Sequence, residues 1–169
     1  NDPLWEKYVA LIENARVSIT IVTPYFVPDK ALFRLLVAAA AKGRRVRVLV
    51  PRRSDHRLLD FARRWYLRQL KEAGAEILFF KPDVLHAKLF IADDESLIIG
   101  SANLDMRSLF LNYEIAAVVR DAAALTAVQS FVASLEAESS PYSEDLYRRS
   151  RTWRGRMLEA ISKTLAPLL

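Results

Sequence analysis

The segment His86-Ala87-Lys88-Leu89-Phe90-Ile91-Ala92-Asp93 lies near the middle of the 169-residue chain. Six residues separate it from the segment Gly100-Ser101-Ala102-Asn103. In an extended strand, successive side chains alternate between the two faces of the sheet. We therefore expect His86 and Lys88 to project from the same face. An imidazole beside an ammonium group is costly there unless an anion lies between them, and phosphate is the simplest such anion.

Three further polar residues follow. Ser101 and Asn103 share one face by the same alternation and supply a hydroxyl and an amide. Glu114 opens an otherwise apolar strand, and it can accept a proton from one imidazole nitrogen while the other nitrogen attacks. Each of these residues alone is more often structural, as a turn residue or a snorkelling lysine. Their joint spacing is what indicates phosphate chemistry.

The apolar patterns around this segment predict an α/β fold. Helices are expected at residues 5–14, 29–42 (capped by Asp29), 54–73 (capped by Ser54 or Asp55), 121–138 and 153–165; strands at 17–22, 46–50, 76–80, 85–92, 96–99 and 114–119; a loop at 23–28 and a polar connection at 141–150. Alternating strands and helices favour parallel pairing, and the closely spaced later strands add antiparallel pairs. The fold class is therefore a mixed, largely parallel β-sheet sandwiched by helices. With no internal repeat or long linker, residues 1–169 are expected to form one domain.

Composition excludes several classes of protein. The chain has no Cys, which rules out a disulfide scaffold, a thiol nucleophile and a thiolate metal site. The longest stretch without a charged residue spans 14 residues, 122–135, whereas a membrane-spanning helix needs about 20. The chain opens on Asn1-Asp2-Pro3 rather than Met. We expect from this start that it is a processed product or a fragment.

The positive charge is concentrated in one part of the chain. The net charge is +5, and residues 42–68 hold ten Lys or Arg against two Asp, a local surplus of +8. A second group of arginines lies at residues 148–156. Such groups suit an anionic partner, either nucleic acid or acidic lipid headgroups. A charge run taken alone is more often a solvated helix face.

The pattern His86-x-Lys88-x4-Asp93 followed by Gly100-Ser101-x-Asn103 resembles the HKD motif of the phospholipase D superfamily. The flanking segments Thr23-Pro24-Tyr25-Phe26-Val27-Pro28 and Asn103-Leu104-Asp105-Met106-Arg107-Ser108 are similar to the cardiolipin synthase branch, in its C-terminal half. The resemblance extends from about residue 5 to residue 169. It implies a phospholipase D-like αβα fold and chemistry without a metal ion or other cofactor.

The resemblance also implies roles for the site residues. One histidine attacks phosphorus to form a phosphohistidine, and a second protonates the leaving alcohol. Lys88, Ser101 and Asn103 would hold the nonbridging oxygens, and Glu114 would orient His86. Asp93 completes the motif, and strand alternation turns it away from Lys88, so we expect a structural role for it in the turn.

This mechanism needs two histidines from two HKD halves, and the chain has one such histidine. His56 lacks a lysine at the required offset and is expected to be a surface residue or partial helix cap. Either a second half precedes this one, making the chain a C-terminal half, or two copies pair as a homodimer. In two-half enzymes the N-terminal histidine is often the nucleophile, so His86 is either the nucleophile or the general acid.

The first functional hypothesis is a phosphatidyltransferase of cardiolipin synthase type, which acts on phospholipid. This segment would be peripheral on the cytoplasmic side of the membrane, with any anchor elsewhere in the parent protein. The basic residues and the loop at residues 24–26 suit a membrane surface. Two alternatives stay open: a homodimeric, single-HKD phosphodiesterase acting on nucleic acid, and a non-catalytic half that completes a site elsewhere.

Overall fold

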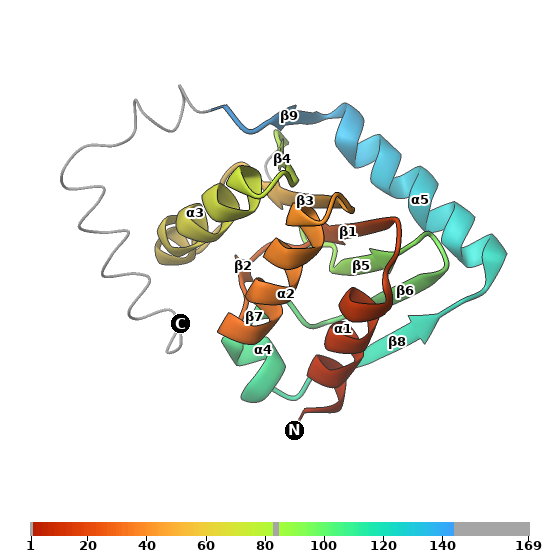
Figure 1. Ribbon diagram of the computed structural model, residues 1–169. Helices are drawn as coiled ribbons and strands as arrows, with labels where there is room; N and C mark the ends of the chain where they lie inside the picture. Colours follow the sequence, from red (N-terminus) through yellow and green to blue (C-terminus); the bar gives the residue numbers. More distant parts are fainter. Residues whose placement is uncertain (1, 83–84, 144–169) are drawn as a thin grey trace.

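The computed structural model describes residues 2–82 and 85–143 as a sheet of seven strands between two layers of helices (Figure 1). The strands are β1 (Ser18–Val22), β3 (Arg45–Pro51), β4 (Glu76–Phe80), β5 (Leu89–Ala92), β6 (Ser96–Gly100), β8 (Ala116–Val119) and β9 (Ser139–Pro141), in the order β8-β6-β5-β1-β3-β4-β9. β1 pairs in parallel with β3, and β3 with β4; the other pairs are antiparallel. Strands β1, β3, β4 and β6 therefore run in the same direction. This mixed α/β architecture confirms the predicted fold class.

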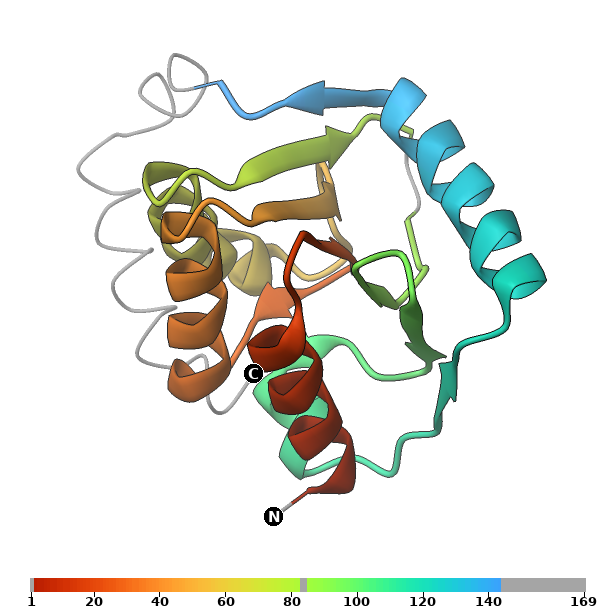
Figure 2. The same cartoon turned by 45° about the vertical axis from the view of Figure 1, so that its right-hand side comes forward.

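Helices cover both faces of the sheet. Helices α1 (Pro3–Asn14), α2 (Lys30–Ala41) and α3 (Arg57–Glu72) lie on one face, and α5 (Ala122–Ala137) lies on the other (Figures 1 and 2). Strand alternation divides the core accordingly: Ile19 and Ile21 pack toward α1 and α2, while Val22 packs with Leu125 of α5. Both clusters are fully apolar, as a sheet buried on two faces requires.

Side-chain caps set the starts of several helices. The carboxylate of Asp29 accepts hydrogen bonds from the amides of Ala31 and Leu32, as predicted, and orphan N–H groups at the start of α2 are thereby satisfied. The predicted cap of α3 was wrong. His56 occupies the N-cap position without a side-chain cap, because Ser54 bonds to Asp60 and Asp55 is engaged elsewhere.

Several short elements escaped prediction from sequence. The expected loop at residues 23–28 contains strand β2 (Phe26–Val27), which pairs in parallel with β7 (Leu104–Asp105) in a separate two-stranded sheet. Helix α4 (Met106–Phe110) follows β7 directly, and β9 begins before the expected polar connection. Two-residue strands carry little local signal, because their pairing depends on segments distant in the chain. The expected helix at 153–165 and the arginines at 148–156 lie outside the described residues.

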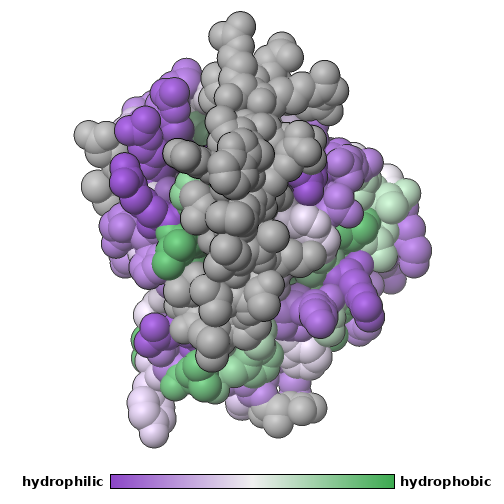
Figure 3. Space-filling model, turned by 90° about the vertical axis from the view of Figure 1, so that its left-hand side faces the viewer, coloured by the Kyte–Doolittle hydropathy of each residue, from purple (hydrophilic) through white to green (hydrophobic). Residues whose placement is uncertain are grey.

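The described surface is mainly polar on one side. Figure 3 shows hydrophilic side chains over most of the visible described part of that face, with a smaller apolar area toward its lower end. Within residues 2–82 and 85–143, no helix has both the length and the apolar character needed to cross a bilayer.

Candidate active site

The strand registers bring most of the HKD motif together at one end of the strands. We call this end of the strands one edge of the sheet. Val22 at the end of β1 pairs with Leu89 at the start of β5, and Leu89 pairs with Ile99 near the end of β6. Ile99 pairs in turn with Ala117 of β8. Residues that follow β1 and β6, and residues that precede β5 and β8, therefore share this edge. The predicted site residues found there are His86, Lys88, Ser101, Asn103 and Glu114.

His86 and Lys88 lie in an irregular segment just before β5, so the predicted strand at 85–92 began too early. The strand-alternation argument therefore does not apply to them. The Lys88 Nζ instead donates a hydrogen bond to the carbonyl of His86 at 2.8 Å, which ties the two residues together. Burial lowers the pKa of Lys88, and the nearby carboxylates of Glu114 and Asp105 oppose that shift. The His86 side chain is exposed and open to a substrate.

Ser101 is held by the segment that leads into β8. Its hydroxyl donates a hydrogen bond to the carboxylate of Glu114 and accepts one from the amide of Ile115 at 3.0 Å. Its own amide donates to the carbonyl of Ile115 at 2.9 Å. Glu114 was expected to orient His86, but no hydrogen bond joins these two side chains within the described part of the chain. The recorded partners of Glu114 are Ser101 and Asn112.

Gly100 explains how Ser101 comes so close to β8. A Cβ atom placed on Gly100 would lie 2.2 Å from the carbonyl oxygen of Ile115 and 2.7 Å from the Cα of Ala116, both backbone atoms. Glycine therefore permits the close approach of the two backbones at the site.

Asn103 is half-buried and Asp105 is buried at this edge. The amide of Asn103 donates weakly to the hydroxyl of Ser108 at 3.4 Å, while its carbonyl oxygen is buried and has no hydrogen-bond partner among the described residues. Burial raises the pKa of Asp105, against the hydrogen bonds it accepts from Ser108. Sequence reasoning assigned no site role to Asp105.

Asp93 lies at the opposite end of β5, in the turn before β6. Its carboxylate accepts hydrogen bonds from the amides of Arg16, Val17 and Ser18 at 2.6 to 2.8 Å. Burial raises the pKa of Asp93, but these bonds outweigh that effect and hold the pKa below its usual value. The carboxylate fixes the entry to β1 and does not face the other motif residues.

A second polar group, which sequence reasoning missed, lines the rim of the same edge. The Tyr25 hydroxyl donates a hydrogen bond to the carboxylate of Asp55, and the Tyr25 ring lies edge-on to His56 with 6.5 Å between ring centroids. Burial and the Asp55 bond raise the pKa of Tyr25 to about 12. Their positions in the sequence could have indicated this group. Tyr25 follows β1 and Asp55 follows β3, and ligands bind outside the carboxyl ends of such parallel strands.

The basic window at residues 42–68 divides between two edges of the sheet. Lys42, Arg44, Arg45 and Arg47 lie at the end where β3 begins, whereas Arg52, Arg53 and Arg57 are exposed beyond its other end, near the motif. Arg63 is buried and pairs with Asp60 at 2.9 Å. Only part of the local charge therefore faces the site.

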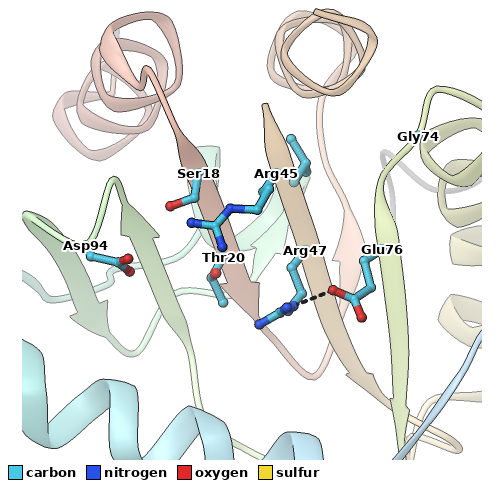
Figure 4. A pocket seen from close by; sticks show the side chains of 8 residues that line it. Ser18, Thr20, Arg45, Arg47, Gly74, Glu76 and Asp94 are labelled. Carbon is cyan, nitrogen blue, oxygen red and sulfur yellow. Dashed lines mark hydrogen bonds and ion pairs between the residues drawn. The ribbon is translucent and has the colours of Figure 1, made fainter. Parts of the chain in front are cut away.

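The edge remote from the motif carries a pocket of about 190 Å³. Figure 4 shows its lining of Ser18, Thr20, Arg45, Arg47, Glu76 and Asp94, with Arg47 paired to Glu76 at 2.7 Å. Arg47 also pairs with Glu136 of α5, so its charge is neutralised. This pocket holds none of the motif residues. Across the described ranges, no cluster of three His, Asp or Glu side chains has an arrangement that would hold a metal ion.

Solved structures share this fold. Nuc from Salmonella typhimurium, a phospholipase D family member, aligns with 82% of this chain and 90% of its own length at a TM-score of 0.71 and 18% identity. Phosphatidylserine synthase from Haemophilus influenzae aligns with 98% of this chain and 45% of its own, at a TM-score of 0.74 and 16% identity. The fold is thus that of the phospholipase D class.

Sequence comparison narrows the class further. The family described as the PLD-like domain of cardiolipin synthase matches residues 8–137. Cardiolipin synthase from Halalkalibacterium halodurans is 39% identical over 99% of this chain, and the major cardiolipin synthase ClsA from Bacillus subtilis is 33% identical over the same share. This chain belongs to the cardiolipin synthase family of PLD-like domains. It spans about a third of the length of these relatives (34% and 36%).

Proposed function

We propose that this chain supplies one half of the active site of a phosphatidyltransferase of cardiolipin synthase type. The observation that carries the proposal is the meeting of His86, Lys88, Ser101 and Asn103 at one edge of the sheet. An exposed imidazole beside an ammonium group, a hydroxyl and an amide suits a phosphodiester, whose charge the lysine offsets. The names of the relatives, all cardiolipin synthases, support a phospholipid substrate.

The proposed reaction has two steps. An imidazole nitrogen attacks the phosphorus of a phospholipid; the N–P bond forms as the P–O bond to the leaving alcohol breaks, and a second imidazole gives that oxygen its proton. The hydroxyl of an acceptor alcohol then attacks phosphorus and passes its proton to the second imidazole as the N–P bond breaks. His86 is one of these two histidines, as nucleophile or as general acid. Lys88, Ser101 and Asn103 hold the nonbridging oxygens, and the reaction uses no metal ion.

The second histidine is proposed to come from another HKD half, either upstream in the same protein or in a second copy of the chain. An exposed apolar group of six residues, which includes both sequence neighbours of Glu114, supports this arrangement. Its members are Ile99, Phe110, Leu111, Tyr113, Ile115 and Val118; Leu111 is 69% exposed and Ile115 79%. Hydrophobic side chains exposed beside a site are typical of an interaction face. A partner seated on it would bring its residues to His86.

The segment is proposed to work at the cytoplasmic face of a membrane, without spanning it. Arg52, Arg53 and Arg57 are exposed on the motif side of the sheet, where they would attract acidic lipid headgroups. The same arginines would also suit nucleic acid, which is the alternative substrate. The likeness to Nuc at 18% identity concerns the fold alone, whereas the cardiolipin synthases reach 39% identity, so phospholipid is the favoured substrate.

The test uses the full-length gene product and its lipid products. We expect His86→Ala to abolish headgroup exchange on phosphatidylglycerol vesicles, and Lys88→Ala to reduce it by roughly a hundredfold or more, as for loss of a charge-stabilising group. Lys42→Ala, which removes an exposed lysine at the opposite edge of the sheet, is the matched control and should retain exchange. Normal exchange by His86→Ala would refute the proposal. Release of nucleotides from DNA, without lipid exchange, would favour the phosphodiesterase alternative.

A further inference from the structure

We infer that Asp55, held in place by Tyr25, forms a subsite that recognises the hydroxyl groups of a polyhydric acceptor alcohol. The inference rests on the proposed phosphatidyl transfer and deepens it, because it assigns the specificity for the acceptor to named residues. These residues lie outside the HKD motif.

Backbone pairing places Tyr25 beside the motif. Phe26 of β2 pairs in parallel with Leu104 of β7. Tyr25 and Asn103 are the residues just before this pair, so they lie on neighbouring segments of the chain. The Thr23 hydroxyl links the two segments: it donates to the carbonyl of Tyr25 at 2.8 Å and accepts from the amide of Leu104 at 3.4 Å. The position of Tyr25 relative to Asn103 is therefore set by the fold.

The start of α3 completes the subsite. The Tyr25 ring packs with Val27, Leu59 and Ala62, which anchors it between β2 and α3. Its hydroxyl then donates to Asp55, the residue just before the N-cap of α3. Asp55 itself is exposed, so one carboxylate oxygen stays open to a ligand. His56 lies edge-on to the same ring.

Charge distinguishes this subsite from the motif. The hydrogen bond from Tyr25 lowers the pKa of Asp55, burial opposes this shift, and the imidazoles of His56 and His86 lower the pKa further. Asp55 is therefore ionised, and it lies at the same edge of the sheet as His86, because it follows β3 while His86 precedes β5, which runs antiparallel to β1 and β3. A carboxylate repels a phosphodiester but is a strong acceptor for neutral hydroxyl groups. Phosphate would accordingly lie at Lys88, and the hydroxyl groups of the alcohol at Asp55.

The test compares a polyhydric with a monohydric acceptor. The full-length gene product is incubated with phosphatidylglycerol vesicles and either labelled glycerol or ethanol; the products are labelled phosphatidylglycerol, phosphatidylethanol and, from water, phosphatidic acid. We expect Asp55→Asn to lower the ratio of glycerol to ethanol transfer by about tenfold or more, through a higher KM for glycerol. Ethanol lacks the second hydroxyl, so its transfer falls much less.

A second variant and a control complete the design. Tyr25→Phe keeps the ring but removes the bond to Asp55, and it should shift the ratio in the same direction by a smaller factor. Asp94→Asn, an exposed aspartate at the remote edge, should leave the ratio unchanged. An unchanged ratio in both Asp55→Asn and Tyr25→Phe, or an equal fall in transfer to both alcohols, would refute this inference. Either result would leave the proposed function intact. If the unmodified enzyme forms none of the three products, the proposed function fails and the inference with it.

Discussion

The hydroxyl of Ser101 donates a hydrogen bond to the carboxylate of Glu114, across the junction of β6 and β8. The two residues are 13 positions apart, and the amide of Ile115 completes the contact by donating to the same hydroxyl. Because a hydroxyl has a single hydrogen, Glu114 competes with a phosphate for the Ser101 O–H, and Ser101 can donate to a nonbridging oxygen only after this bond is released. The predicted partner of Glu114, His86, is not among its hydrogen-bond partners in the described residues.

This contact predicts a graded effect of substitution at Glu114. Glu114→Gln keeps an oxygen that can accept from Ser101, whereas Glu114→Ala keeps none. We expect Glu114→Ala to lower the free energy of unfolding by about 1 kcal/mol and Glu114→Gln by clearly less. Urea unfolding of the 169-residue chain measures both values. Equal losses from the two variants would show that the Ser101 bond is not what Glu114 contributes.

The close approach at Gly100 predicts a large effect of one added methyl group. Gly100→Ala forces a Cβ against the backbone of Ile115 and Ala116, so we expect a loss of about 2–3 kcal/mol in the free energy of unfolding, together with lost activity. Gly43→Ala is the matched control. Gly43 has a φ of 84°, and no atom of the described residues lies within 4 Å of an added Cβ, so Gly43→Ala should cost only about 1–2 kcal/mol of backbone strain and spare activity. A milder effect at Gly100 than at Gly43 would contradict this account.

The capping bonds of Asp93 predict a pH-dependent stability. Because its pKa is lowered in the folded state, its contribution is full above the unfolded pKa of about 3.9 and is lost as the pH falls through the folded pKa. We expect Asp93→Asn to cost about 1–2 kcal/mol near neutral pH and progressively less below about pH 4. Asparagine tolerates the positive φ of 53° at this position.

Asp94→Asn provides the control for this pH series. Asp94 also has a positive φ, of 59°, and is exposed. Denaturant unfolding gives the free energy of unfolding of both variants from neutral pH down into the acid range. The two values should differ at neutral pH and converge in acid. A penalty for Asp93→Asn that stays constant with pH would rule out the charged carboxylate as its source.

The exposed apolar group predicts that substitutions within it destabilise the longer protein more than the 169-residue chain. Leu111 and Tyr113 are exposed in the 169-residue chain. The double substitution Leu111→Ser and Tyr113→Ser should therefore change its free energy of unfolding by less than about 0.5 kcal/mol. For the arrangement with the second half upstream in the same protein, these residues would be covered in the full-length gene product, and we expect a loss of about 2 kcal/mol or more in its free energy of unfolding. Phe131→Ser on α5, 46% exposed, is the control and should behave alike in both. Identical small effects in the two proteins would place the second half elsewhere.

Local patterns in the sequence determined much of this protein. The apolar runs predicted most strands of the large sheet to within a few residues, because burial on two faces demands continuous apolar strands. The Asp29 cap was predicted because it depends only on the next few residues. The spacing from His86 to Asn103 identified the family, since five polar residue types at fixed intervals rarely occur by chance.

Only the tertiary structure decided how those residues meet. The pairing of β2 with β7, the approach of Tyr25 to Asp55 and the bond from Ser101 to Glu114 each join segments well separated in the chain. His86 and Lys88 were misplaced on a strand because strand ends depend on which partners remain available, and β5 begins only at Leu89. Sequence periodicity reports which face a residue takes within its own element. Which elements share an edge depends on register and packing between distant segments, and that determines the site.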